Sequence, residues 1–346
     1  PINYYPGKTM ELSTKDIPEA IVNVLYAGKV PFLKGSPGIG KSDIIKQVAE
    51  ELNLKVIDFR LSQADPTDLQ GFPGVENGRA TFLPAALFPI EGDTVPQGYN
   101  GWLLFLDEMN SAPLSVQAAA YKLCLDRQVG QNNLHKNVAV IGAGNLATDK
   151  AITQRIGTAM QSRLIHLNMG VDPDHWLKWA NVAGIDHRIT SFIEYRKELL
   201  FKFNPSHADD TFACPRTWAF LSDIIKGKEK LSHIDVVTAA GTVGEGCALE
   251  FKGFSEIFQS LPKIKDIISK PSTVKIPNEP SVHYALAGLI AYEVTTENID
   301  NLSKFVERLP ADFQVVTWKS AVRRNAEIME APYIDAWVTK NAQEML

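Results

Sequence analysis

The sequence predicts an α/β fold in which an open parallel sheet is followed by a helical region. Over the first 170 residues, short and nearly continuous apolar runs alternate with helical patterns, which is typical of parallel strands covered on both faces. Beyond Gly170 the pattern is helical, with no strand alternation. We therefore expect an α/β core over residues 1–170, a small helical domain over residues 171–260 and a helical extension over residues 261–346.

The expected elements follow from local patterns. Five apolar runs are expected to form the sheet: Val30–Lys34, Lys55–Leu61, Trp102–Asp107, Val138–Ala143 and Leu164–Asn168. Helical spacing of apolar residues predicts a helix over residues 44–52. A second helix is expected to open at Ser111, with Pro113 in its first turn, and to run towards Arg127. The Asn77-Gly78 pair predicts a hairpin near residues 71–84. Six later segments are expected to be helical: 174–203, 215–226, 232–260, 281–292, 299–309 and 313–330.

The composition excludes several classes of protein. The chain of 346 residues is 45% hydrophobic and has a net charge of -5, which excludes intrinsic disorder. Its densest basic cluster is Arg323-Arg324, so nucleic acid is not favoured as a partner, although sparse basic loops leave contacts with phosphates open. The sequence predicts no membrane span and no export signal, and its three scattered cysteines suit a reducing compartment. We therefore expect a cytoplasmic protein with no membrane partner.

A phosphate-binding loop follows the first expected strand. It fits the pattern G-x-x-x-x-G-K-[ST] and reads Gly35-Ser36-Pro37-Gly38-Ile39-Gly40-Lys41-Ser42. Glycines let the backbone N–H groups converge on phosphate oxygens, and the next helix directs its N-terminus at the same anion. Lys41 is then expected to contact the β- and γ-phosphates, and Ser42 to offer its hydroxyl to Mg²⁺. A chance match in a glycine-bearing loop is the alternative, but the strand before it and the amphipathic helix after it disfavour chance.

Two carboxylates end the third expected strand. The strand Trp102–Leu106 is wholly apolar and leads into Asp107 and Glu108. Ligand chemistry in open α/β sheets lies at strand ends, so we expect Asp107 to bind Mg²⁺ and Glu108 to activate a water molecule. The alternative is an ordinary acidic turn. A second acid beside the metal ligand favours ATP hydrolysis over phosphoryl transfer by a small-molecule kinase.

The fourth expected strand ends in a second glycine motif. Its segment 142–147 fits G-x-G-x-x-A, the fingerprint of dinucleotide-binding folds. That fingerprint also requires an acidic residue at the end of the next strand, whereas this strand ends in Asn168. An NAD(P)-binding module is therefore only a distant alternative. The favoured interpretation makes Asn145 a polar sensor of the γ-phosphate.

Several motifs recur in the order and spacing of one known family. The segment after the strand reads Asp107-Glu108-Met109-Asn110-Ser111-Ala112-Pro113, followed by Gln117-Ala118-Ala119 and Asp126-Arg127-Gln128-Val129. Upstream lie Asp68-Leu69-Gln70-Gly71 and Ala80-Thr81-Phe82-Leu83-Pro84-Ala85-Ala86-Leu87-Phe88. These segments resemble the D-E-I-N-R-A-P, Q-A-A-L, E-R-Q-V and D-L-x-G … F-x-x-G-P-L-F motifs of the MoxR family of AAA+ ATPases, the MoxR and CbbQ-like group. The resemblance covers about residues 14–250.

The resemblance assigns further site residues. Asn145 matches the sensor 1 asparagine, Arg163 matches the family's arginine finger, and Arg216 matches its sensor 2 arginine. Arg155 is the alternative finger. Departures occur at Ser111, where the family has arginine, and at Leu164, where it has phenylalanine; the segment around Asn145 differs too. These departures bear on partner choice more than on hydrolysis.

The resemblance also implies how such a protein works. It implies an AAA+ P-loop core followed by a helical lid, which binds ATP and Mg²⁺ between the subunits of a ring, with six subunits expected. The finger would come from the neighbouring subunit, and hydrolysis would remodel a partner protein, of which von Willebrand factor A domain proteins are an example. The hairpin near residues 71–84 would be the helix 2 insert, facing the central pore. The alternatives are an AAA+ ATPase acting on nucleic acid, as a helicase loader or translocase, and a P-loop small-molecule kinase.

Overall fold

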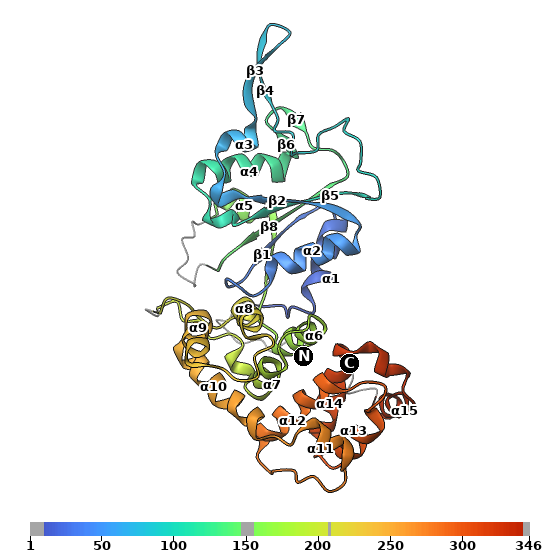
Figure 1. The fold of residues 1–346 in the computed structure, drawn as a ribbon. Coiled ribbons are helices and arrows are strands. Elements are labelled where there is room, and N and C mark those ends of the chain that lie inside the picture. Colours follow the sequence, from blue (N-terminus) through green and yellow to red (C-terminus); the bar gives the residue numbers. More distant parts are fainter. Residues whose placement is uncertain (1–9, 147–155, 207–208, 342–346) are drawn as a thin grey trace. The chain divides into compact units, whose positions relative to one another are not determined.

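The chain forms two compact units in the computed structural model, which describes residues 10–146, 156–206 and 209–341 (Figure 1). One unit comprises residues 1–172 and 204–206, and the other comprises residues 173–203 and 207–346. The first unit contains a parallel sheet with flanking helices, and the described part of the second is built from helices. The predicted fold class, an α/β core followed by a helical region, is confirmed.

The first unit is organised by a parallel sheet of five strands in the order β2-β5-β8-β1-β9. The strands are β1 (Val30–Lys34), β2 (Leu54–Arg60), β5 (Gly101–Asp107), β8 (Val138–Gly144) and β9 (Leu164–Asn168). Each begins and ends within one residue of its expected bounds. Strand β5, which lies between β2 and β8, is buried along residues 101–106, which explains its unbroken apolar sequence.

Helices cover both faces of this sheet (Figure 1). On one face lie α1 (Ile17–Tyr26) and α2 (Lys41–Glu51). On the other lies α4 (Leu114–Asp126), beside the short helix α3 (Pro66–Gln70). On the α4 side of the sheet, helix residues pack in one apolar core with every second residue of the strands. This core includes Val116 and Leu123 from α4, Leu104 and Leu106 from β5, and Val140 from β8. Alternation along the strands therefore divides the apolar runs between two buried layers.

Helix α4 begins later than predicted. We expected it to open at Ser111, but residues Met109–Ser111 form a turn of 3₁₀-helix and α4 begins at Leu114. The reason is Pro113, because the residue before a proline is disfavoured in the helical conformation. Ala112 is extended, with ψ 151°, and Pro113 stands just before the helix rather than within its first turn.

A hairpin leaves the core between α3 and β5. Its strands are β3 (Phe72–Glu76) and β4 (Arg79–Leu83), paired antiparallel from Phe72↔Leu83 to Glu76↔Arg79. The turn residues Asn77 and Gly78 have φ values of 51° and 73°, as a type I′ turn requires. A second, unexpected hairpin pairs β6 (Gln128–Val129) with β7 (Asn132–Asn133).

The second unit contains more helices than the sequence patterns predicted. Its helices are α6 (Pro173–Val182), α7 (His187–Tyr195), α8 (Pro215–Ile225), α9 (His233–Val243), α10 (Glu245–Ser260), α11 (Ile264–Ser269), α12 (Pro280–Glu293), α13 (Ile299–Val306), α14 (Ala311–Arg324) and α15 (Pro332–Lys340). The expected helix over 174–203 is broken near Gly184 and the one over 232–260 at Gly244, where φ is 71° and 87°. Helix α14 ends at Arg324, short of the expected 330, and α11 and α15 were not expected.

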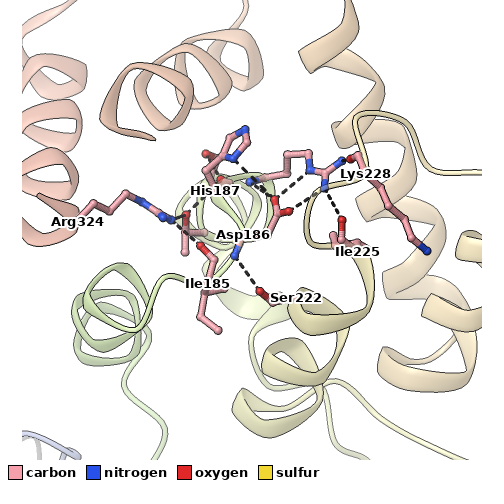
Figure 2. Close-up of polar contacts among 10 residues, drawn as sticks. Ile185, Asp186, His187, Ser222, Ile225, Lys228 and Arg324 are labelled. Atoms are coloured by element: carbon pink, nitrogen blue, oxygen red, sulfur yellow. Dashed lines mark hydrogen bonds and ion pairs between the residues drawn. The ribbon is translucent and has the colours of Figure 1, made fainter. Parts of the chain in front are cut away.

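A buried ion pair holds the turn between α6 and α7 to α8 and the segment after it (Figure 2). The Arg188 guanidinium donates to both carboxylate oxygens of Asp186, at 2.9 and 2.7 Å. Its remaining donors reach the carbonyl oxygens of Lys228 (2.7 Å) and Ile225 (3.2 Å). The backbone N–H of Asp186 donates to Ser222 Oγ at 2.9 Å. Burial alone would raise the pKa of Asp186, but the hydrogen bonds and charge of Arg188 outweigh it and lower that pKa.

Arg324 joins the C-terminal helices to the same turn. From the end of α14 its guanidinium donates to the Ile185 carbonyl oxygen at 2.8 Å and to Thr190 Oγ1 at 2.9 Å. Helix α12 packs against α7 and α14 as well. The region predicted as a separate extension therefore packs with the preceding helices in one unit.

His187 is buried beside these charges. Its ring stacks on Tyr292, with centroids 4.5 Å apart, and meets Phe258 edge-on. Burial, assisted by the positive charges of Arg188 and Arg324 and opposed by Asp186, lowers the pKa of His187 to about 4. The folded protein therefore holds this imidazole neutral where an unfolded chain would protonate it.

His187 is expected to make folding sensitive to acid. Because the folded pKa lies below the ordinary 6.5, the stabilisation is complete above pH 6.5 and is lost as the pH falls towards about 4. At pH 5 the loss from this one group is about 2 kcal/mol. We expect urea denaturation, followed by tryptophan fluorescence, to show a larger loss between pH 7.5 and 5 in the wild type than in His187→Phe. Parallel profiles for the two proteins would contradict the assignment.

Candidate nucleotide-binding site

The candidate site lies at the carboxyl edge of the parallel sheet. Strand β1 leads into the loop at Gly35, β5 ends at Asp107, and β8 leads into Asn145. The register aligns Lys34 with Gly144 and Leu106 with Gly142, so the three strands end within a few residues of one another. The sheet therefore brings together groups that lie up to 110 residues apart in the sequence.

The loop from Gly35 to Ser42 curls onto the start of α2. Gly38 and Gly40 have φ values of 77° and 95°, the left-handed region that favours glycine. A Cβ on Gly35 would lie 2.6 Å from Ile39 Cδ1 and 3.1 Å from the Met169 carbonyl oxygen, so a larger residue there would require both neighbours to shift. No side chain of the described residues caps the first turn of α2. Helix N-termini that follow a glycine-rich loop bind anions through their N–H groups and the positive end of the helix dipole.

Lys41 lies inside this loop. Its ammonium donates to the carbonyl oxygens of Gly35 (2.7 Å) and Ser36 (2.9 Å) and to Asn145 Oδ1 (3.2 Å). The loop lysine and the residue after β8 are therefore in contact although 104 residues separate them. An anion held by the loop would lie beside both side chains.

The acidic pair lies at the end of β5. Burial raises the pKa of Asp107, the neighbouring charges of Glu108 and Asp58 add to that rise, and Lys41 and a hydrogen bond from the Glu108 N–H oppose it. That hydrogen bond reaches Asp107 Oδ1 at 2.8 Å. Glu108 has φ 53°, in the left-handed region, which costs a non-glycine residue about 1–2 kcal/mol. Backbone strain of this kind is concentrated at functional sites.

Glu108 is engaged by residues that the sequence did not single out. Ser62 Oγ donates to Glu108 Oε2, and Arg60 Nε lies 3.9 Å from Glu108 Oε1. Both partners lie where β2, the neighbour of β5, ends. No motif marks Arg60 or Ser62, because their contact with Glu108 follows from strand pairing and not from sequence spacing.

The donor set at this edge fits Mg²⁺. The ion prefers oxygen ligands and commonly binds proteins through one or two side chains, with water and substrate phosphates completing its octahedron. Asp107 offers a carboxylate and Ser42, at the start of α2, a hydroxyl. Among the described residues, no group of three or more His, Cys, Asp or Glu forms a dedicated metal cage.

The second glycine motif has a packing explanation. A Cβ on Gly142 would lie 3.0 Å from Met109 Sδ and 3.1 Å from a Phe32 ring carbon. A Cβ on Gly144 would overlap the Asn110 side chain and lie 2.9 Å from Phe32 Cζ. These glycines let the turn after β5 approach β8, which is a sufficient reason for them without a dinucleotide.

The expected arginines lie in different places. Arg163 is exposed and directly precedes β9, whose first residue pairs with Val30 and whose last pairs with Lys34. It therefore lies at the amino edge of the sheet, about 16 Å from the loop edge, farther than one arginine side chain extends. Arg216 belongs to the second unit, where it is exposed in the first turn of α8. Arg155 lies outside the described residues.

Comparison with known proteins assigns part of the first unit. Residues 31–164 match the AAA domain family, dynein-related subfamily. That span contains the phosphate loop, the acidic pair and Asn145, and it covers less than half of the chain. An AAA domain implies nucleotide binding and ATPase activity in general, and members of the wider AAA+ group usually assemble into rings.

Two solved structures that resemble the chain have low sequence identity to it. A crystal structure of a proposed ATPase from Cytophaga hutchinsonii is 14% identical, with a TM-score of 0.35, and the alignment covers 96% of this chain and 89% of that one. A mutant of RuvB from Thermotoga maritima is 13% identical, with a TM-score of 0.33 and the same coverage. No curated protein matches the chain. None of the described helices combines the length and the apolar character that a membrane span requires.

Proposed function

We propose that the chain is an Mg²⁺-dependent ATPase of the MoxR-like kind, which works in a ring and remodels a partner protein. The observation that carries the ATPase proposal is the convergence of Lys41 and Asn145 at the strand ends beside Asp107 and Glu108. The glycines of the second motif are explained by packing, so they do not indicate an NAD(P)-binding module. Nucleotide hydrolysis is therefore favoured over that alternative. The Glu108 carboxylate beside Asp107 favours hydrolysis over a small-molecule kinase.

Each group has a definite part in the proposed reaction. The loop N–H groups and Lys41 would hold the β- and γ-phosphates of ATP, and Asn145 would contact the γ-phosphate. Ser42 and Asp107 would hold Mg²⁺, whose charge would offset that developing on the phosphates. Glu108 would accept the proton of the attacking water. Its carboxylate can do so while it keeps its contacts with Ser62 and Arg60, because its two oxygens offer about four lone-pair sites.

Removing the general base is expected to separate binding from hydrolysis. Glu108→Gln keeps the shape of the side chain but cannot accept a proton, so kcat should fall about 10²- to 10⁴-fold while ATP still binds. Steady-state phosphate release and nucleotide binding measure the two properties. Glu50→Gln, which changes an exposed carboxylate of α2, is the matched control and should hydrolyse ATP at the wild-type rate. Unreduced turnover in Glu108→Gln would contradict the role of Glu108.

The proposed finger is Arg163 supplied by a neighbouring subunit. Its position at the amino edge of the sheet supports a role in trans, because it is remote from the phosphate loop of its own chain. A finger of this kind contributes about 10³- to 10⁵-fold in rate. Arg216 would sense the γ-phosphate from the first turn of α8, and six subunits are the proposed ring size.

Mixing two inactive variants tests the shared site. Lys41→Ala should not hold ATP productively, and Arg163→Ala should bind ATP but hydrolyse it about 10³-fold more slowly. In mixed rings some sites combine an intact loop with an intact finger, so the mixture should recover activity that neither variant has alone. Wild-type activity per subunit should also rise with protein concentration. Failure to recover, together with full activity of dilute monomer, would contradict the shared site; Arg155→Ala tests the alternative finger.

The proposed contact with the partner protein is the β3–β4 hairpin. Several apolar side chains are exposed on it: Phe72, Val75, Phe82 and Leu83. Exposed apolar side chains of this kind suit a protein client better than a nucleic acid, whose phosphates need positive charge. The net charge of -5 agrees with a protein client. A von Willebrand factor A domain protein is the proposed class of partner.

Deleting the hairpin tip should separate hydrolysis from remodelling. A chain without residues 74–80 keeps the sheet and the loop, so basal ATP hydrolysis should stay within about twofold of the wild type. Affinity capture with a Glu108→Gln chain in excess ATP should recover a dominant protein, and the same chain without the tip should lose it. Equal capture by both chains would contradict the role of the hairpin. Hydrolysis that DNA stimulates in a salt-sensitive manner would favour the nucleic-acid alternative.

A further inference from the structure

Asn110 makes a two-point contact with the proposed γ-phosphate sensor. Its Nδ2 donates to the Asn145 carbonyl oxygen at 2.8 Å, and its Oδ1 accepts a hydrogen bond from the Asn145 N–H at 3.1 Å. One amide side chain thus satisfies both backbone polar groups of Asn145. Asn110 is only 7% exposed, so its amide has little access to water as an alternative partner.

The packing around Asn110 is tight. A Cβ on Gly144 would overlap its Oδ1 and lie 2.7 Å from its Cγ. Any other residue at position 144 would therefore force the amide away from Asn145. The turn Met109–Ser111 that carries Asn110 directly follows the acidic pair, so the contact ties the two proposed catalytic segments together.

The contact between Asn110 and Asn145 lies directly after the end of strand β8. Strand β8 ends at Gly144, whose carbonyl oxygen accepts a hydrogen bond from the Gly35 N–H at 3.3 Å. Asn145 lies one residue beyond that, and its backbone is held by Asn110 rather than by a strand. Its side chain in turn meets Lys41 Nζ at 3.2 Å. A chain of contacts therefore runs from Asn110 through Asn145 to the loop lysine.

We propose that Asn110 is a positioning residue that acts through Asn145. It sets where the Asn145 amide stands relative to Lys41 and the acidic pair, and so lets the site distinguish a nucleotide with a γ-phosphate from one without. The inference rests on the proposed ATPase function and on the role of Asn145 within it. Misplacement of such a group by about 1 Å costs up to about 10²-fold in rate.

A double-mutant cycle tests this coupling. Asn110→Ala should lower kcat about 10- to 100-fold, as Asn145→Ala should. The double variant should be no slower than Asn145→Ala. Asn110 acts through Asn145, so removing Asn110 has no further effect once the Asn145 side chain is gone. Gln117→Ala is the matched control: Gln117 is also a buried amide, which donates to the Ala112 carbonyl oxygen at 3.0 Å in the same segment. The Gln117→Ala variant should have a lower free energy of unfolding than the wild type but the same kcat.

Nucleotide preference gives a second readout, independent of turnover. The ratio of ADP to ATP dissociation constants should fall towards one in Asn110→Ala and in Asn145→Ala, and should stay at the wild-type value in Gln117→Ala. Additive losses in the cycle, or an unchanged ratio in Asn110→Ala, would overturn the inference. A wild type that prefers ATP but does not hydrolyse it would overturn the ATPase proposal alone. A wild type that binds neither nucleotide would overturn both.

Discussion

The register of three parallel strands is the constraint on which the candidate site depends. Strands β5, β8 and β1 are neighbours and run in the same direction, so the chain leaves the sheet at one edge after each of them. A slip of two residues in β8 would keep its side chains on the same faces but would carry Asn145 past Lys41. The 3.2 Å contact between these two side chains therefore depends on this register.

Neighbouring segments can pack closely at this edge of the sheet because three positions there are glycine and carry no side chain. Gly35 leaves room for Ile39, and Gly142 and Gly144 leave room for Met109, Asn110 and the buried ring of Phe32. The same two glycines produce the pattern that resembles a dinucleotide fingerprint. A glycine motif thus indicates that another group lies close to the backbone. Only the tertiary structure shows whether that group is a ligand or another part of the chain.

The second unit depends on a different kind of interaction. The Asp186–Arg188 pair is buried and its hydrogen bonds hold α7 to the end of α8 and the segment after it, while Arg324 brings α14 to the same turn. Buried pairs of this sort contribute little net stability over an apolar core, but losing one partner costs about 3–5 kcal/mol. Here the hydrogen bonds of this pair and of Arg324 join α7, the end of α8 and α14.

Local patterns in the sequence determined the five strands of the sheet, the phosphate loop and the acidic pair, because apolar runs, glycine spacing and strand ends are signals within a few neighbouring residues. They did not determine where helices break: Gly184 and Gly244 interrupt expected helices, and Pro113 delays α4. Nor did they reveal that Ser62 and Arg60 meet Glu108 or that Asn110 holds Asn145. Those partners lie 35 to 48 residues apart in the sequence, and only strand order and register bring them within hydrogen-bond or ion-pair distance.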